Sequence, residues 1–211
     1  MLRGLLRPFL SFSLESTAKL PKRCLFIASI GNPEPAYKGT RHNAGHRLMN
    51  QLIEIYWKDH VYKEGPYYLS LKYPNLVLFK SNDSLMNLQG RAIQKHLTPT
   101  NRENMIVLHD ELQRDLGKFQ IRNPGTMSRG HNGLRSLDKC MGQKYRKLGI
   151  GIGRPSNSSV VDYVMGKFTP EDAEILDFEV FPKCVAALEK LIDEDLQQLK
   201  DVDESTDGLN M

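Results

Sequence analysis

The apolar and polar positions along the chain follow two periods, one typical of strands and one typical of helices. An uninterrupted apolar run over residues 24–30 predicts a buried strand. Residues 45–57 place apolar side chains at helical spacing, which predicts a helix with one apolar face. Residues 67–73 alternate between apolar and polar, and residues 76–79 follow after a Pro-Asn turn. This region therefore predicts a β-hairpin.

The second half of the chain repeats the same alternation of short elements. Helices are expected near 88–97 and over 131–141, and strands over 105–108, 118–122 and 147–152. Thr169, followed by Pro170 and two acids, is a typical helix start, and a long C-terminal helical region, interrupted near Pro182, is expected after it. Strands interleaved with helices predict one α/β domain over residues 23–195, with a mixed central β-sheet surrounded by helices.

The net charge of +4 is distributed unevenly along the chain. Residues 193–211 hold seven acids and one base, and we expect residues 196–211 to form a disordered acidic tail. Residues 114–154 hold ten Lys or Arg and two acids. Such a local excess of positive charge is typical of a surface that binds a phosphate backbone, although a basic stretch is more often only a solvated surface.

The first 22 residues have the composition of a mitochondrial transit peptide. They combine arginine, serine and apolar side chains with a single acid. We therefore expect a targeting extension and a location in the mitochondrial matrix. The alternative is an ordinary disordered extension on a cytoplasmic protein.

Several classes of protein are disfavoured by motifs that the sequence lacks. Cys24, Cys140 and Cys184 are odd in number and far apart, which argues against a disulfide framework or a zinc site. No apolar stretch approaches the roughly 18 residues that suggest a membrane span. Gly151 and Gly153 follow a predicted strand, but no complete dinucleotide fingerprint or P-loop is present. The sequence predicts no cofactor, no metal and no membrane partner.

Candidate chemistry gathers on the loop after the first predicted strand. Asn32, Tyr37 and His42 lie on this loop, and Asp110 closes the predicted strand 105–108. An imidazole can accept a proton near neutral pH, and a carboxylate can fix its tautomer. A single histidine or aspartate is more often structural, so the pattern alone leaves both a catalytic and a structural role open for these residues. The sequence has no Gly-x-Ser-x-Gly nucleophile elbow, so it does not indicate a serine nucleophile.

Five segments of the chain together resemble the bacterial-type peptidyl-tRNA hydrolase family, in the same order and at similar spacing, across about residues 24–190. They are Gly31–Gly45, Ser84–Gly90, Val107–Leu112, Arg129–Leu134 and Ile150–Pro155. The resemblance implies an α/β fold and hydrolysis of the ester between a peptide and the 3′ ribose of tRNA, by direct water attack and without a cofactor. It also implies a monomer that binds the acceptor stem and 3′ end of peptidyl-tRNA.

The resemblance assigns roles to particular residues. His42 corresponds to the catalytic base, Asp110 to its carboxylate partner, and Asn32 to a residue near the attacking water. Asn87 and Asn132 correspond to residues near the peptide and the 3′-terminal nucleotide. Tyr37 and Met86 resemble positions that line the pocket. From strand geometry, His109 and Glu111 are expected to point away from the face that carries Asp110.

The resemblance fails at the residues that clamp the tRNA 5′ phosphate. Bacterial members have a lysine and an arginine where this chain has Gln120 and Gly149. We expect neighbouring bases to supply the phosphate contacts instead: Lys118, Arg122, Arg146 and Lys147.

A second function, from another class, is a non-catalytic RNA-binding or splicing accessory factor, because some proteins that resemble this family have that role. Such a protein would need a basic surface but no base–carboxylate pair. His42, Asp110 and the three asparagines are all present, which favours the hydrolase.

Overall fold

The computed structural model describes residues 24–155 and 159–207. The predicted targeting extension, residues 1–22, therefore lies outside the described residues. Among the described residues, no helix is both long and apolar enough to cross a bilayer.

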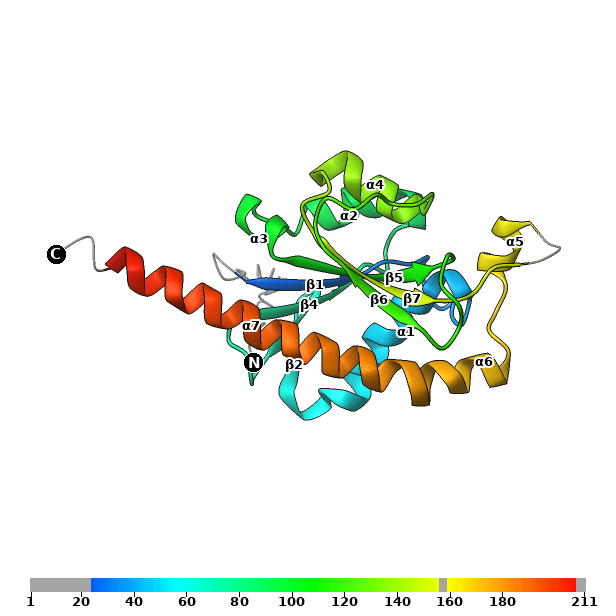
Figure 1. Cartoon of the computed structure of the whole chain (residues 1–211), viewed down its shortest axis with the longest axis horizontal. Coiled ribbons are helices and arrows are strands. Elements are labelled where there is room, and N and C mark those ends of the chain that lie inside the picture. The colour runs from blue at the N-terminus through cyan, green and yellow to red at the C-terminus, as the bar shows by residue number, and fades with distance from the viewer. Residues whose placement is uncertain (1–23, 156–158, 208–211) are drawn as a thin grey trace, which may run out of the picture.

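A seven-stranded mixed sheet with the order β2-β3-β4-β1-β5-β7-β6 forms the centre of the fold (Figure 1). The four central strands are parallel to one another, whereas β2, β3 and β6 pair antiparallel with their neighbours. The predicted mixed α/β sheet and the predicted hairpin are both confirmed. The strands are β1 Leu25–Ser29, β2 Val61–Glu64, β3 Tyr67–Ser70, β4 Leu76–Lys80, β5 Met105–Glu111, β6 Phe119–Arg122 and β7 Arg146–Gly151.

Helices cover both faces of the sheet. In Figure 1, α2, α3 and α4 lie on one side and α1, α6 and α7 on the other. The helices are α1 Ala44–Gln51, α2 Gln89–Gln94, α3 Pro99–Glu103, α4 Asn132–Met141, α5 Val160–Met165, α6 Pro170–Glu174 and α7 Phe181–Asp207. Single 3₁₀ turns at Arg41–Asn43, Lys58–His60 and Met86–Leu88, and π-helical turns at Leu52–Tyr56 and Ile175–Val180, complete the helical structure.

The apolar run in β1 is continuous because this strand is buried on both faces. Leu25 and Ile27 belong to the core beneath α1 and α7, whereas Phe26 and Ala28 belong to the core beneath α2 and α4. A parallel strand in the middle of a sheet covered on both sides has no solvent face to mark with polar residues.

The C-terminal helical region differs from its prediction in two ways. The capping box at Thr169 is confirmed, with Asp172 as its reciprocal partner. The expected interruption near Pro182 is a π-helical turn over Ile175–Val180, immediately before α7, rather than a break between helices. Helix α7 then continues to Asp207, into the segment from residue 196 for which an acidic tail was predicted. The acidic composition there does not prevent continuation of the long helix.

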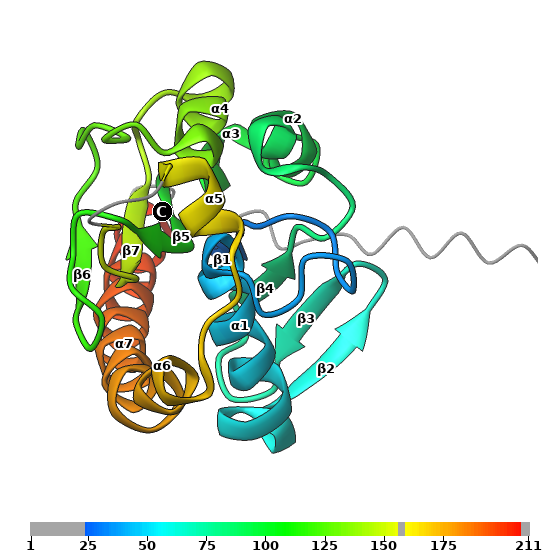
Figure 2. The same ribbon diagram turned by 90° about the vertical axis from the view of Figure 1, so that its right-hand side faces the viewer.

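The topology brings the candidate residues to one edge of the sheet (Figure 2). Parallel strands β1, β4 and β5 all end at this edge, so the loops that follow them meet there. Helix α1 approaches β5 closely because residue 45 is glycine: a Cβ at Gly45 would lie 2.3 Å from the Leu108 carbonyl oxygen. This close contact places the 3₁₀ turn that carries His42 against the end of β5.

Candidate active site

A buried carboxylate at the end of β5 holds the His42 imidazole. His42 Nδ1 lies 2.9 Å from Asp110 Oδ1 and 3.0 Å from Oδ2. Only 2% of the Asp110 side chain and 11% of the His42 side chain are exposed. Since the carboxylate can only accept, Nδ1 carries the proton and Nε2 carries the lone pair. Nε2 has no hydrogen-bond partner among the described residues.

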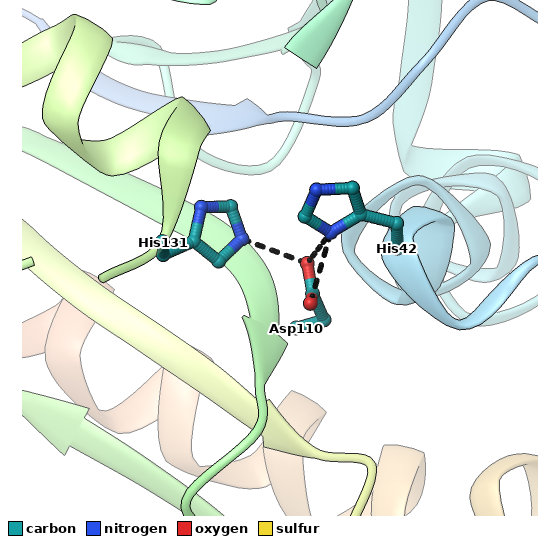
Figure 3. A group of neighbouring side chains, drawn as sticks. All are labelled: His42, Asp110 and His131. Carbon is teal, nitrogen blue, oxygen red and sulfur yellow. Dashed lines mark hydrogen bonds and ion pairs between the residues drawn. The ribbon is translucent and has the colours of Figure 1, made fainter. Parts of the chain in front are cut away.

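A second histidine, His131, binds the same carboxylate from the start of α4. Its Nε2 lies 2.8 Å from Asp110 Oδ1 (Figure 3). Its Nδ1 accepts hydrogen bonds from the backbone N–H groups of Gly133, at 3.1 Å, and Leu134, at 3.2 Å. Because Nδ1 is an acceptor, the proton is on Nε2 and is donated to Asp110. His131 therefore caps α4 and orients Asp110 at the same time.

Sequence reasoning did not find His131. The only signal was its position inside the Arg129–Leu134 segment, directly before Asn132. Its contact with Asp110 depends on how closely α4 approaches the site. Gly133 permits that approach, because a Cβ there would lie 2.4 Å from Met86 Sδ.

The contacts in this cluster shift the pKa values of Asp110 and His42. Burial alone would raise the pKa of Asp110, but His42 and His131 hold that pKa well below its usual value. Burial alone would lower the pKa of His42, but the charge of Asp110 and its hydrogen bond outweigh burial and raise it. Asp110 is thus ionised at neutral pH, and His42 is a stronger base than an isolated imidazole.

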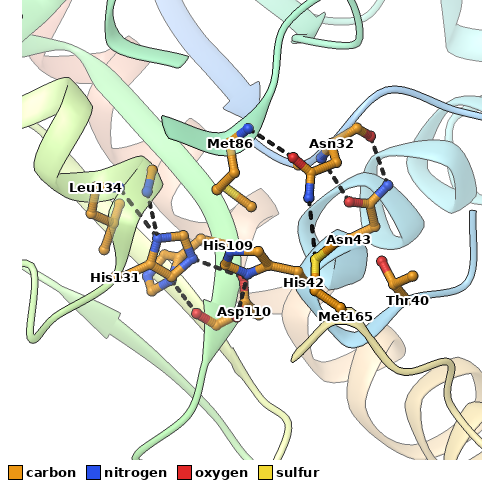
Figure 4. Close-up of polar contacts among 12 residues, drawn as sticks. Asn32, Thr40, His42, Asn43, Met86, His109, Asp110, His131, Leu134 and Met165 are labelled. Atoms are coloured by element: carbon orange, nitrogen blue, oxygen red, sulfur yellow. Dashed lines mark hydrogen bonds and ion pairs between the residues drawn. The ribbon is translucent and has the colours of Figure 1, made fainter. Parts of the chain in front are cut away.

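Asn32 is fixed by an interlocking pair of asparagines (Figure 4). The Asn32 backbone N–H donates to Asn43 Oδ1 at 2.7 Å, and Asn43 Nδ2 donates to the Asn32 carbonyl oxygen at 2.9 Å. Asn32 Oδ1 accepts from the Met86 N–H at 2.8 Å. Among the described residues, the Asn32 amide nitrogen has only the thioether of Met165, at 3.7 Å, as a partner, so it keeps donor capacity for a ligand. The role of Asn43 in bracing Asn32 was not predicted.

Two hollows meet at Asn132. A cavity of about 220 Å³ is lined by His42, Asp110 and His131 on one side and by apolar side chains of α5 on the other. A groove of about 650 Å³ between α2 and α4 is lined by Asn87. Asn132 lines both hollows, so the structure brings it together with His42 and with Asn87.

The resemblance also places Met86 and Tyr37 in the pocket, but among the described residues neither lines one of the two hollows. Met86 is only 4% exposed and belongs to the core beneath α2 and α4, so it supports the site through its N–H and its packing. Tyr37 lies in the turns after β1 and lines neither hollow in the part of the chain that the structure describes. His109 was expected to face away from the site, yet its ring lies 5.3 Å from the His131 ring and lines the cavity.

The four predicted phosphate contacts do not form one cluster. Lys118 is exposed and pairs with Asp115 at 2.9 Å. Arg146 pairs with Asp195 of α7, with 15% of its side chain exposed. Arg122 and Lys147 are buried, at 5% and 0% exposure, so a phosphate could reach them only if the structure rearranged. Of the four, Lys118 is the only one whose charge is openly exposed.

His42, Asp110 and His131 also form a set that could hold a metal ion, with one donor atom from each lying within 4.8 Å of the others. The sequence spacing did not indicate this set, because His131 reaches Asp110 only through the placement of α4. Both nitrogens that face Asp110 already bind it directly, which accounts for the geometry through hydrogen bonds alone.

Fold and site together define a single-domain α/β protein in which a buried carboxylate at the end of a central strand orients a histidine. Residues 26–207 match the family model described as peptidyl-tRNA hydrolase. The chain belongs to the peptidyl-tRNA hydrolase family.

Relatives from distant organisms support the same family. A peptidyl-tRNA hydrolase from Wolinella succinogenes is 32% identical over 80% of this chain and 88% of its own length. One from Saccharomyces cerevisiae is 36% identical over 80% of this chain and 96% of its own. The crystal structure of peptidyl-tRNA hydrolase from Acinetobacter baumannii superposes with a TM-score of 0.63 at 25% identity, covering 83% of this chain and 91% of that one.

Proposed function

We propose that this protein hydrolyses the ester between the peptide and the 3′ ribose of peptidyl-tRNA, and so releases free tRNA for reuse in translation. The observation that carries the proposal is the His42–Asp110 pair. Both carboxylate oxygens bind Nδ1, at 2.9 and 3.0 Å, which leaves Nε2 as a free proton acceptor.

The reaction proceeds by direct attack of water. His42 Nε2 takes a proton as the water oxygen bonds to the ester carbonyl carbon, and buried Asp110 stabilises the imidazolium that forms. The tetrahedral intermediate then collapses, and the ribose 3′ oxygen leaves with the proton held by His42. The Asn32 amide nitrogen, whose one partner in the described part of the chain is a weakly accepting thioether, is the available donor for the attacking water or the developing oxyanion.

Asn87 and Asn132 bind the peptide and the 3′-terminal nucleotide in this proposal. Both line the hollow beside the cavity, and an amide can donate and accept at once. The tRNA is bound through its acceptor stem and 3′ end, and the protein acts as a monomer. Lys118 is a candidate phosphate contact because 62% of its side chain is exposed.

The proposal is tested by hydrolysis of N-blocked aminoacyl-tRNA by the purified chain beside a His42→Ala variant. General-base catalysis is worth about 10²–10⁴-fold, so the variant should lose that factor while it still binds tRNA. A loss of less than about tenfold, ~1.4 kcal/mol of barrier, would exclude His42 as the base. If a folded parent binds tRNA without cleaving the ester, the RNA-binding accessory function is favoured instead.

The mitochondrial location is a separate proposal. It rests on the composition of residues 1–22, which lie outside the described residues. Fusion of these residues to a reporter, with a matched fusion in which Arg3 and Arg7 become glutamine, tests it directly. Matrix import of the first reporter and not the second is the expected result.

A further inference from the structure

The groove between α2 and α4 is the larger of the two hollows that meet at Asn132, at about 650 Å³. Its walls carry three basic side chains and no carboxylate. The full lining is Asn87, Leu88, Arg91, Asn132, Arg135, Ser136, Lys139 and Cys140. We call this surface the α2–α4 groove.

The basic side chains of the α2–α4 groove have no acidic partners among the described residues. Arg91 projects from α2, and Arg135 and Lys139 from α4; all three are exposed, and none forms an ion pair in the described part of the chain. Arg135 and Lys139 are four residues apart on one helix, where like charges repel and destabilise the helix by a few tenths of a kcal/mol. Some cations elsewhere are paired with acids, as in Arg47–Asp177 and Arg122–Glu111. Three uncompensated charges facing one hollow indicate an anionic ligand.

The α2–α4 groove is connected to the active site. Asn132 lines both hollows, and Arg135 donates a hydrogen bond to Asn132 Oδ1. From Asn132 to Lys139 the groove follows seven residues of helix, about 10 Å at 1.5 Å per residue. At about 3.4 Å per stacked nucleotide, this length fits roughly three nucleotides of one strand.

We propose that the α2–α4 groove binds the phosphates of the single-stranded 3′ end of tRNA and leads that strand to the ester beside His42. This inference rests on the proposed function, since it assigns one part of the same substrate to one surface. The alternative occupant is the peptide. A peptide of arbitrary sequence carries no regular negative charge, whereas each nucleotide does, so three unpaired cations favour RNA. The other hollow, walled by Val160, Val161 and Val164, is apolar enough for a peptide.

The first test compares two RNAs on one pair of protein variants. Arg91→Gln/Lys139→Gln removes two charges from the α2–α4 groove and leaves Arg135 on Asn132. Lys58→Gln/Lys63→Gln removes two exposed charges near the β2 edge as the matched control. The probes are a synthetic acceptor stem with its 3′ overhang and the same stem made blunt.

The groove variant should bind the overhang RNA about tenfold more weakly and the blunt RNA like the parent. Its plot of log K against log salt for the overhang RNA should be flatter by about 1.4, from two single-strand contacts at about 0.7 each. The control should match the parent on both RNAs. Equal losses on both RNAs, or no loss on either, would overturn the proposal.

Cys140 provides a second readout that is independent of charge. It is half-buried in the groove wall, whereas Cys24 and Cys184 are buried, so a thiol reagent reports on this surface. The overhang RNA should slow labelling of Cys140 in the parent, and the blunt RNA should not. Labelling that the overhang RNA leaves unchanged would count against the groove.

The same experiments distinguish RNA binding by the groove from peptide binding there and from the proposed hydrolase activity. If the groove variant binds both RNAs like the parent but cleaves substrates with acidic peptides more slowly, the groove is a peptide site and the proposal is wrong. Both binding assays use RNA that carries no amino acid or peptide. They therefore test RNA binding by the groove even if the parent fails to hydrolyse the ester. Failure of the proposed activity and failure of the groove are therefore distinguishable.

Discussion

Asp110 and Glu111 are consecutive residues of β5, both almost completely buried, yet they have different kinds of partner. Asp110 binds two imidazoles, and Glu111 pairs with Arg122, whose Nη2 lies 3.1 Å from Glu111 Oε2. An imidazole can gain or lose a proton near neutral pH, whereas a guanidinium stays charged. Burial and charge pairing are therefore common to both carboxylates, and the feature that sets Asp110 apart is that its partners are titratable.

The largest difference should appear when each carboxylate is changed to its amide. In Asp110→Asn the site keeps its shape, but the amide can donate to Nδ1 and so permits the wrong imidazole tautomer. The amide also cannot stabilise the imidazolium. We expect kcat to fall about 10³–10⁴-fold, by analogy with loss of the carboxylate from a catalytic triad. Single-turnover hydrolysis of N-blocked aminoacyl-tRNA measures this loss. A decrease smaller than that of Glu111→Gln would reverse the assignment.

The amide change at Glu111 should affect stability more than catalysis. Glu111→Gln leaves Arg122 as a buried charge without a counter-charge, and breaking a buried pair costs about 3–5 kcal/mol. For a protein of this size that corresponds to a decrease in Tm of roughly 6–20 °C. Calorimetry of both variants checks the contrast. Glu111→Gln/Arg122→Met, which removes both charges, should recover part of the loss, and no recovery would show that the pair is not the cause.

His131→Asn should separate the two roles of His131. Asparagine is a good N-cap and can keep the start of α4, but it is too short to reach Asp110. We expect stability within about 1 kcal/mol of the parent and kcat lower by about tenfold, since one charge-orienting hydrogen bond of roughly 1.4 kcal/mol is lost. His131→Ala is the matched variant that also loses the cap, so it should add a stability loss of about 1 kcal/mol. Parent-like turnover in His131→Asn would restrict His131 to capping.

The parts of this molecule that sequence predicts well are those fixed locally. The apolar run of β1 follows from burial on both faces, and Thr169 with Asp172 forms its capping box within four residues. The meeting of His42 and Asp110 was expected from the resemblance and is present in the structure; their catalytic roles stay predictions until turnover is measured.

The parts that sequence missed depend on distant packing. His131 reaches Asp110 only because α4 begins beside β5, across 21 residues of sequence. Burial of Arg122 and Lys147 was not predicted either, because charged residues in a strand normally indicate a solvent face. In β6 and β7 these two side chains are register partners beneath the helices, where Arg122 finds Glu111 and the Lys147 ammonium lies 4.1 Å from the Tyr145 ring centre.

The smallest effect expected is a shift in the midpoint of the pH dependence of kcat/KM. This shift distinguishes Asp110 from Glu111 in variants that still fold and turn over. His42 must be neutral to act as a base, and its pKa is raised above its usual 6.5, so kcat/KM should rise with pH through a midpoint above 6.5. The contribution of His42 to stability runs the other way: it is complete below pH 6.5 and is lost as pH rises through the folded pKa.

His131→Asn, which removes a donor from Asp110, leaves more negative charge facing His42 and should move the midpoint higher. Glu111→Gln should leave the midpoint in place, because the pKa of His42 is set by burial and by Asp110, and neither Glu111 nor Arg122 contributes to its shift. A midpoint that moves equally in both variants would mean that the two carboxylates act on His42 as one charged cluster, and the distinction between them would fail.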